Sequence, residues 1–149
     1  TPAAGDDYIG VQAYQRFFID ENGPVPTPDG LEMTKNGWEY YPQSLGKAAA
    51  KTWELGEHTP LVVTENGLAT DDDRQRIRYT TSALQALHEV MEGGADVRGY
   101  IHWSLLDNYE WGSYDPTFGL IAVNRTTFER QPKPSLNWLG SIQWEGLTI

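Results

Sequence analysis

The chain alternates between short apolar runs and longer segments in which apolar residues recur every three or four positions. Short apolar or β-branched runs predict strands, and helical spacing predicts helices. The strands are predicted at residues 7–14, 61–64 and 97–105, and the helices at residues 43–56 and from Asp71–Asp73 to Gly93-Gly94. This alternation is typical of an α/β fold with a parallel sheet. The run at Leu61–Thr64 lacks polar alternation, which favours a strand covered on both faces.

Three further segments complete the predicted order of elements. Residues 20–38 are rich in Pro, Gly, Asp and Asn, which predicts one long loop. Gly119–Val123 and Thr127–Arg130 are expected to pair as a hairpin, and Pro134-Ser135 to start a last short helix. Three parallel strands cannot close a barrel, and an open sheet of this size would leave two exposed edges. We therefore expect the chain to be incomplete as a single fold.

The chain begins with Thr1, and its first residues lack the pattern of a targeting segment. We expect it to begin within a longer protein, and an upstream signal peptide would lie outside the printed sequence. The expected location is the cytoplasm. No stretch approaches the roughly 18 consecutive apolar residues of a membrane span, so no contact with a membrane is predicted.

The 149 residues carry a net charge of −10. Such a surface repels nucleic-acid phosphates, and no cluster of Lys and Arg offsets it, so no nucleic-acid partner is expected. The chain has no Cys, and His58, His88 and His102 lack the spacing of metal ligands. G-x-G-x-x-G and P-loop motifs are absent from the sequence. Neither a metal nor a cofactor is therefore predicted.

Glu65 follows the apolar run Leu61–Thr64 directly and precedes Asn66-Gly67. In parallel α/β folds the reactive groups gather at the carboxyl ends of strands, where Glu65 is expected to lie. Asn66 and Gly67 suit a tight turn that would hold the carboxylate there. The alternative is that Glu65 only begins a loop.

The segment Tyr100–Trp111 combines aromatic rings with acids and amides at close range. Trp103 is expected near the end of its strand, and the polar and aromatic residues Asp107, Asn108, Glu110 and Trp111 follow it. Apolar ring faces beside carboxylates and amides fit a sugar, whose CH face stacks on rings while its hydroxyls bond to the polar groups. The alternative is that these Trp residues fill a core. His102 is expected to face away from Trp103, because strand side chains alternate.

Tyr14 is predicted at the end of the first strand. A phenol there can donate a hydrogen bond to a carboxylate on a neighbouring strand and hold it ionised. The alternative is that Tyr14 only packs.

Four motifs occur in one order along the chain: TENG, GYIHWSLLDNYEW, FGL and QPKPS followed by Trp138. In this order they resemble the C-terminal portion of glycoside hydrolase family 1, the retaining β-glucosidases and their relatives. The resemblance extends from DYIGVQAY to KPSLNWLGSI. It implies that residues 1–149 are a C-terminal fragment of a single (β/α)8 TIM-barrel domain and supply about its last three strand–helix units.

The resemblance also implies roles for individual residues. Glu65 matches the family's nucleophile, and Tyr14 matches the tyrosine that bonds to it. The residues matching sugar contacts are Trp103 as the platform under the ring, Glu110 and Trp111 at the ring hydroxyls, and Phe118 near the 6-hydroxymethyl group. The family often has a cis bond at the step that corresponds to Trp103-Ser104.

Some family features are changed or missing. Gln12-Ala13-Tyr14 stands where many members read NYY, and Thr117 stands where an Arg often precedes the residue at Phe118. The family's acid/base Glu lies in an N-E-P motif, which does not occur in this sequence. The resemblance therefore implies that the isolated chain is inactive, and that a complementary N-terminal barrel fragment carries the acid.

The substrate implied is a terminal β-D-glucoside, with β-galactosides and β-fucosides left open. Glu110 favours neutral sugars over phosphorylated ones, because a carboxylate bonds to hydroxyls. Two alternatives remain: a non-catalytic carbohydrate-binding module in which Glu65 is idle, and a structural barrel fragment that needs a complementary chain.

Overall fold

A parallel sheet of three strands organises the computed structural model, which describes residues 5–142. The strands are β1 (Ile9–Gln12), β4 (Leu61–Asn66) and β5 (Val97–His102), in the order β1-β4-β5. The three predicted strands and their parallel pairing are confirmed. Their predicted ends were wrong, because β1 and β5 are shorter than expected and β4 continues through Glu65 to Asn66.

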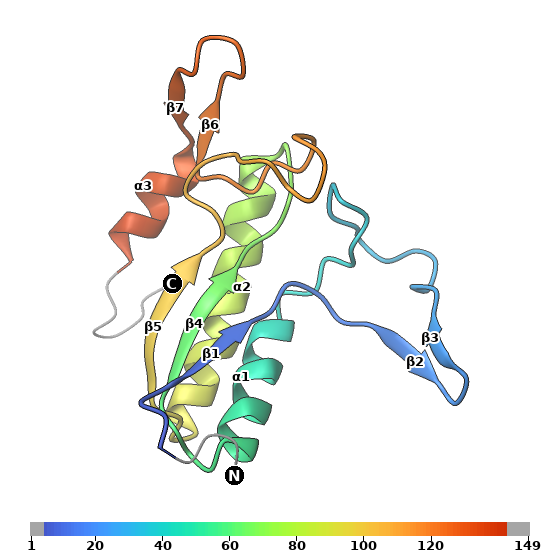
Figure 1. Ribbon diagram of the computed structural model, residues 1–149, viewed down its shortest axis with the longest axis vertical. Coiled ribbons are helices and arrows are strands. Elements are labelled where there is room, and N and C mark those ends of the chain that lie inside the picture. Colours follow the sequence, from blue (N-terminus) through green and yellow to red (C-terminus); the bar gives the residue numbers. More distant parts are fainter. Residues whose placement is uncertain (1–4, 143–149) are drawn as a thin grey trace.

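Two helices, α1 (Ser44–Leu55) and α2 (Asp73–Glu92), lie side by side against one face of the sheet (Figure 1). Both helices were predicted within two residues of these bounds. Asp72 caps the start of α2, since its carboxylate accepts the backbone N–H of Arg74 at 3.0 Å. Gly93 caps the other end of α2, with its N–H bonded to Glu89.

The core lies between the sheet and these two helices. Its buried members come from β1, β4, α1 and α2 and include Val11, Leu45, Ala49, Leu61, Val63, Tyr79, Ala83 and Leu87. Along β4 burial alternates, with Leu61 and Val63 buried and Val62 only half-buried. The expectation that β4 is covered on both faces is therefore wrong within the described residues, because the helices cover one face only.

Two antiparallel hairpins project from this layer (Figure 1). One pairs β2 (Phe18–Asp20) with β3 (Gly23–Val25) in a region predicted to be loop from residue 20. That prediction was wrong because strands of three residues are too short to show a period. The turn is set locally, since the Asp20 carboxylate accepts the N–H groups of Asn22 and Gly23.

The second hairpin pairs β6 (Ile121–Val123) with β7 (Arg130–Pro132), and α3 (Pro134–Ser141) follows it as predicted. A hairpin here is confirmed, but its second strand starts three residues later than expected. The Asn124 side chain accepts the N–H groups of Thr126 and Thr127, which extends the turn through the start of the predicted strand.

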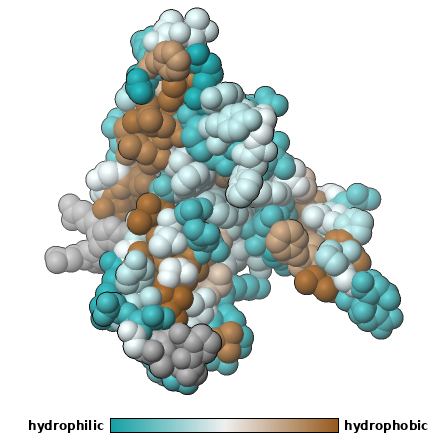
Figure 2. Space-filling view, viewed as in Figure 1, coloured by the Kyte–Doolittle hydropathy of each residue, from teal (hydrophilic) through white to brown (hydrophobic). Residues whose placement is uncertain are grey.

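Within residues 5–142, β1 and β5 each pair along one side only. Large apolar side chains are exposed beside β5, with Ile101 56% and Leu105 57% accessible. Figure 2 shows apolar surface running from the β6–β7 hairpin down over β5. None of the helices in the described part of the chain is both long and apolar enough to cross a membrane.

Candidate active site

Glu65 is the penultimate residue of β4, and a β-bulge determines its direction. The register slips by one residue between Val63 and Glu65 relative to β1, and again between Val63 and Asn66 relative to β5. A bulge inserts one residue and re-aims the side chains that follow it. The result is that Glu65 lines a hollow at the carboxyl end of the strands, while Asn66 is fully buried.

Tyr14 lies two residues beyond the end of β1 and donates its phenolic hydrogen to Glu65 Oε2 at 2.7 Å. Burial raises the pKa of Tyr14 well above its usual value, and the hydrogen bond to Glu65 raises it further. Tyr14 therefore remains a proton-bearing donor across the physiological range. The pairing predicted between a strand-end phenol and a neighbouring carboxylate is present.

The hollow beside this pair has a volume of about 290 Å³. It brings together the six residues to which the resemblance assigned roles, and adds Gln12 and Trp38. Its lining consists of Gln12, Tyr14, Trp38, Glu65, Trp103, Glu110, Trp111 and Phe118. The hollow is open to one side, since Trp111 is fully exposed at its rim while Phe118 is buried.

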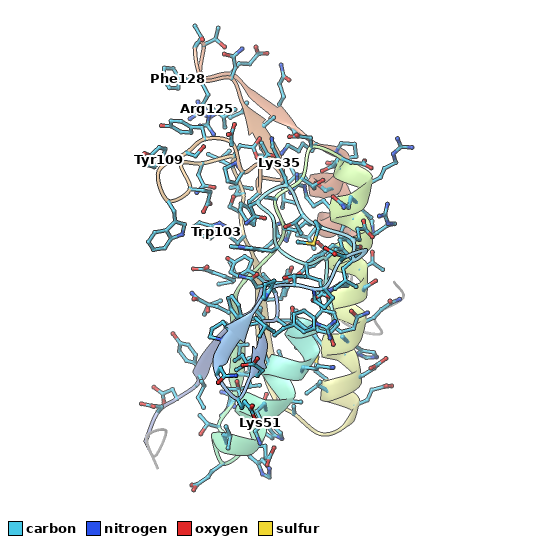
Figure 3. The ribbon with its side chains drawn as sticks, turned by 90° about the vertical axis from the view of Figure 1, so that its right-hand side faces the viewer. Lys35, Lys51, Trp103, Tyr109, Arg125 and Phe128 are labelled. Atoms are coloured by element: carbon cyan, nitrogen blue, oxygen red, sulfur yellow. The ribbon has the colours of Figure 1, made fainter. Side chains whose placement is uncertain are left out.

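Trp103 and Glu110 are held together on one wall. The indole Nε1–H of Trp103 donates to Glu110 Oε1 at 2.9 Å, and the Asn108 amide donates to the same oxygen at 2.6 Å. The Trp103-Ser104 bond is cis, as the resemblance implied. In Figure 3, Trp103 lies between Lys51 near one end of the molecule and Tyr109, Arg125 and Phe128 toward the other.

Trp38 was not singled out because it lies at the end of the long loop predicted over residues 20–38, which has no apolar pattern. Its ring is 5.8 Å from that of Tyr14 and 6.2 Å from that of Phe118. The loop is anchored next to Trp38, where Arg16 donates to both oxygens of the buried Glu39 at 2.7 and 2.8 Å. A Trp among turn residues, away from any apolar run, was the available sequence signal.

Asp107 does not line the hollow, contrary to the grouping made from the sequence. Its Oδ1 accepts the N–H of Gly119 at 2.8 Å and the ammonium of Lys133 at 2.9 Å. Asp107 therefore fixes the loop that leads to Phe118.

Gly67 is needed for a different reason than expected, because a Cβ there would lie 1.9 Å from the Trp103 carbonyl oxygen. Close approach of two strand ends, not a turn, requires glycine.

His102 faces away from the hollow, and its Nδ1 lies 3.2 Å from the Tyr100 hydroxyl. Burial, and after it the charge of Arg76, lowers the pKa of His102 to about 3. No group of three or more His, Cys, Asp or Glu side chains within residues 5–142 is arranged to hold a metal ion.

Acid is expected to destabilise the fold through His102. Between pH 6.5 and about 3 the unfolded chain binds a proton at this imidazole and the folded chain does not, so stability falls as the pH falls. The slope attributable to this group is about 1.4 kcal/mol per pH unit. Urea unfolding at pH 7.5, 5.5 and 4.5 should show that His102→Gln loses less stability on acidification than the parent. Parallel losses in the two proteins would contradict the assignment.

The site therefore places a hydrogen-bonded pair of Tyr and Glu inside an aromatic hollow, at the carboxyl edge of the parallel sheet of an α/β fold. The chain belongs to glycosyl hydrolase family 1, whose sequence profile matches residues 12–146.

Curated relatives and solved structures agree with this assignment. The chain is 44% identical over 145 residues to a β-galactosidase of Saccharolobus solfataricus, covering 87% of this chain and 29% of that protein. It is 46% identical over 151 residues to β-glucosidase 47 of Arabidopsis thaliana, covering 89% of this chain and 28% of the relative. The chain thus spans less than a third of the length of these relatives.

Among solved structures, the apo form of a β-glucosidase designated 1317 aligns with a TM-score of 0.88 and 44% identity, covering 95% of this chain and 35% of that one. A β-glucosidase from Thermotoga maritima in complex with glucoimidazole aligns with a TM-score of 0.85 and 28% identity, covering 91% and 34%. These neighbours are TIM barrels, and the chain corresponds to about a third of each.

Proposed function

We propose that this chain supplies the nucleophile and one wall of the sugar site of a retaining β-glucosidase. The observation that carries the proposal is the 2.7 Å hydrogen bond from Tyr14 to Glu65 inside a hollow walled by Trp103, Glu110 and Trp111. Its volume of about 290 Å³ lies just below the range of about 300–1,000 Å³ for small-molecule sites, and in the proposal the missing part of the barrel supplies the remaining walls.

In this proposal Glu65 attacks the anomeric carbon of a β-glucoside. The new bond joins a Glu65 oxygen to that carbon, and the glycosidic C–O bond breaks as the second carboxyl group protonates the leaving oxygen. Water, deprotonated by the same group, then displaces Glu65 and restores the β configuration. Tyr14 orients the attacking carboxylate by its hydrogen bond.

The remaining lining residues are assigned to recognition of the sugar. Trp103 supplies a ring face for the CH groups, and Glu110, fixed by Trp103 and Asn108, presents a carboxylate to the hydroxyls. Trp111 forms the exposed rim, Phe118 lies toward the 6-hydroxymethyl group, and Gln12 offers an amide from β1.

The sheet is proposed to be one arc of a (β/α)8 barrel, formed by about the last three strand–helix units. The unpaired sides of β1 and β5 and the exposed Ile101 support this, because a closed barrel pairs both edges and fills its interior. The sequence contains no Asn-Glu-Pro motif. The proton donor is therefore assigned to a complementary N-terminal barrel segment.

The substrate class proposed is a terminal β-D-glucoside. Relatives are named as β-galactosidases, as β-glucosidases and, in Bifidobacterium breve, as a bifunctional β-D-glucosidase/β-D-fucosidase. These names support β-linked neutral hexoses and 6-deoxyhexoses as further substrates of the completed protein.

The test uses a completed barrel, meaning this chain co-expressed with an N-terminal family-1 segment that carries the Asn-Glu-Pro motif. A 2-fluoro β-glucoside with a good leaving group is expected to form a stable covalent adduct on Glu65, identified by peptide mass spectrometry. The 149-residue chain alone should show no turnover of 4-nitrophenyl β-glucoside. Robust turnover by the chain alone would refute the assignment of the acid to another segment.

A non-catalytic carbohydrate-binding module is the rival, supported by the same aromatic wall. The trapping experiment separates the two. Glucose binding by the completed barrel without any adduct on Glu65 would favour the module, and an adduct on Glu65 would exclude it.

A further inference from the structure

The backbone around Tyr14 is held by side chains where the strand ladder stops. The β1 ladder ends at Gln12, which pairs with Glu65. Beyond it, the N–H of Ala13 still donates to the Glu65 carbonyl at 3.3 Å. Tyr14 therefore lies outside the regular sheet, although its phenol must meet one carboxylate oxygen.

Asn66 supplies the first of two side-chain bonds at this point. Its amide donates to the Ala13 carbonyl at 2.7 Å, and its Oδ1 accepts the Tyr100 hydroxyl at 3.0 Å. Asn66 is completely buried and adjoins Glu65 in β4. One side chain thus ties the segment before Tyr14 to β4 and β5.

Tyr79 supplies the second bond. From α2, its hydroxyl donates to the Tyr14 carbonyl at 3.0 Å, and its ring is fully buried against Tyr40 at 5.4 Å. A phenylalanine would fill the same space without a hydroxyl to bury. Burying a hydroxyl costs about 1–3 kcal/mol unless it is bonded, and the Tyr14 carbonyl is the bonding partner found here.

We propose that Asn66 and Tyr79 are positioning residues that fix the Tyr14 phenol on the Glu65 carboxylate. The bulge that directs Glu65 toward the hollow also turns Asn66 into the core. One irregularity in β4 therefore places both the Glu65 carboxylate and the Asn66 amide that holds the segment before Tyr14. This inference rests on the proposed function for its catalytic consequence. The structural part of the inference, that Asn66 and Tyr79 fix the backbone around Tyr14, does not depend on the proposed function.

Tyr79→Phe is the mildest test, because it removes one hydroxyl and keeps the ring. In the completed barrel, the rate of trapping by a saturating 2-fluoro β-glucoside is expected to fall roughly 10- to 100-fold, since small misplacement of a catalytic group has costs of this size. The inhibition constant of a β-thioglucoside should change less than about twofold. Tyr40→Phe, which removes the hydroxyl from the facing ring of the same pair, should leave both quantities unchanged.

A double variant distinguishes positioning from general loosening of the fold. If Tyr79 acts through Tyr14, then Tyr14→Phe/Tyr79→Phe is trapped no more slowly than Tyr14→Phe alone. Additive losses would overturn the proposal, as would unchanged trapping in Tyr79→Phe. Asn66→Leu has the same branched shape, brings no donor to the Ala13 carbonyl and adds no charge, and it should behave like Tyr79→Phe in the same cycle.

A readout without activity separates failure of this inference from failure of the proposed function. Crystal structures of the completed barrel and of its variants give the distance between the Tyr14 hydroxyl and the nearer Glu65 oxygen. This distance should stay near 2.7 Å in Tyr40→Phe, and it should shift beyond hydrogen-bonding range, to more than about 3.5 Å, in Tyr79→Phe and Asn66→Leu. If the parent is never trapped but this shift occurs, the proposed function fails and the positioning stands. No shift in either variant would overturn the positioning.

Discussion

Glu65→Ala in the completed barrel is expected to lose at least about 10⁴-fold in turnover of 4-nitrophenyl β-glucoside, because it removes the group that forms the covalent bond. The side chain lies at the end of β4, accepts the Tyr14 hydroxyl at 2.7 Å and lines the hollow. The measurement is the steady-state rate, with thermal unfolding to establish that the variant is folded. Glu54→Ala is the matched control, since that carboxylate is 69% exposed on α1.

Added azide should restore glucoside cleavage in Glu65→Ala and give an α-glycosyl azide. The removed side chain leaves space beside Tyr14, from which a small anion can attack the same face of the sugar. A nitrogen–carbon bond then forms as the glycosidic bond breaks, with one inversion in place of two. A β-glycosyl azide, or activity in Glu65→Ala equal to that of the parent, would exclude Glu65 as the nucleophile.

Arg76→Met should cause the largest loss of stability, about 3–5 kcal/mol, since it removes one partner of a buried ion pair. The Arg76 side chain is 1% exposed, and its Nε donates to Asp73 at 3.0 Å. Its other donors bond four backbone carbonyls on two loops. The acceptors are Leu68, Thr70, Thr117 and Phe118, at 3.0 to 3.1 Å. Without Arg76 the buried Leu68 carbonyl loses its donor. The other three carbonyls each keep one weaker or local partner, from the Thr117 hydroxyl and the N–H groups of Thr70 and Ser104. The loop that carries Phe118 also loses its bonds to the Arg76 side chain of α2.

The measurement is the midpoint of urea unfolding of the chain, followed by tryptophan fluorescence. Arg74→Met is the matched control, because the Arg74 side chain is 92% exposed on the same helix and should change stability by less than about 0.5 kcal/mol. Equal midpoints for the two variants would show that the Arg76 network contributes little to the fold.

The sequence predicted most of the regular structure because its signals are local. Helical spacing and acidic or glycine ends defined α2, and a β-branched run followed by Glu65 defined β4. The β2–β3 hairpin was missed because three-residue strands carry no periodicity. The start of the second strand of the last hairpin was predicted too early, because the Asn124 side chain bonds the N–H groups of Thr126 and Thr127 and keeps these residues in the turn.

The candidate site was predicted mainly from motifs, and its geometry could not be derived from them. Tyr14 and Glu65 are 51 positions apart, and Trp38 entered the hollow from a loop with no apolar pattern. Asp107 carried the same sequence signal as Glu110, yet it bonds Gly119 and Lys133 outside the hollow. Which carboxylate faces the site depends on partners that a linear pattern does not specify. The catalytic and sugar-binding roles of these residues stay predictions.

The sequence by itself determined the alternation of strands and helices and the family's motifs, because propensity, capping and spacing act over a few residues. Tertiary structure alone decided the bulge that turns Glu65 outward and Asn66 inward, and the edge-to-face contact of Trp38 with Tyr14. It also decided the burial of Arg76 against four carbonyls. These outcomes depend on groups that meet only after the sheet and helices pack, where each buried polar atom must find a partner distant in sequence.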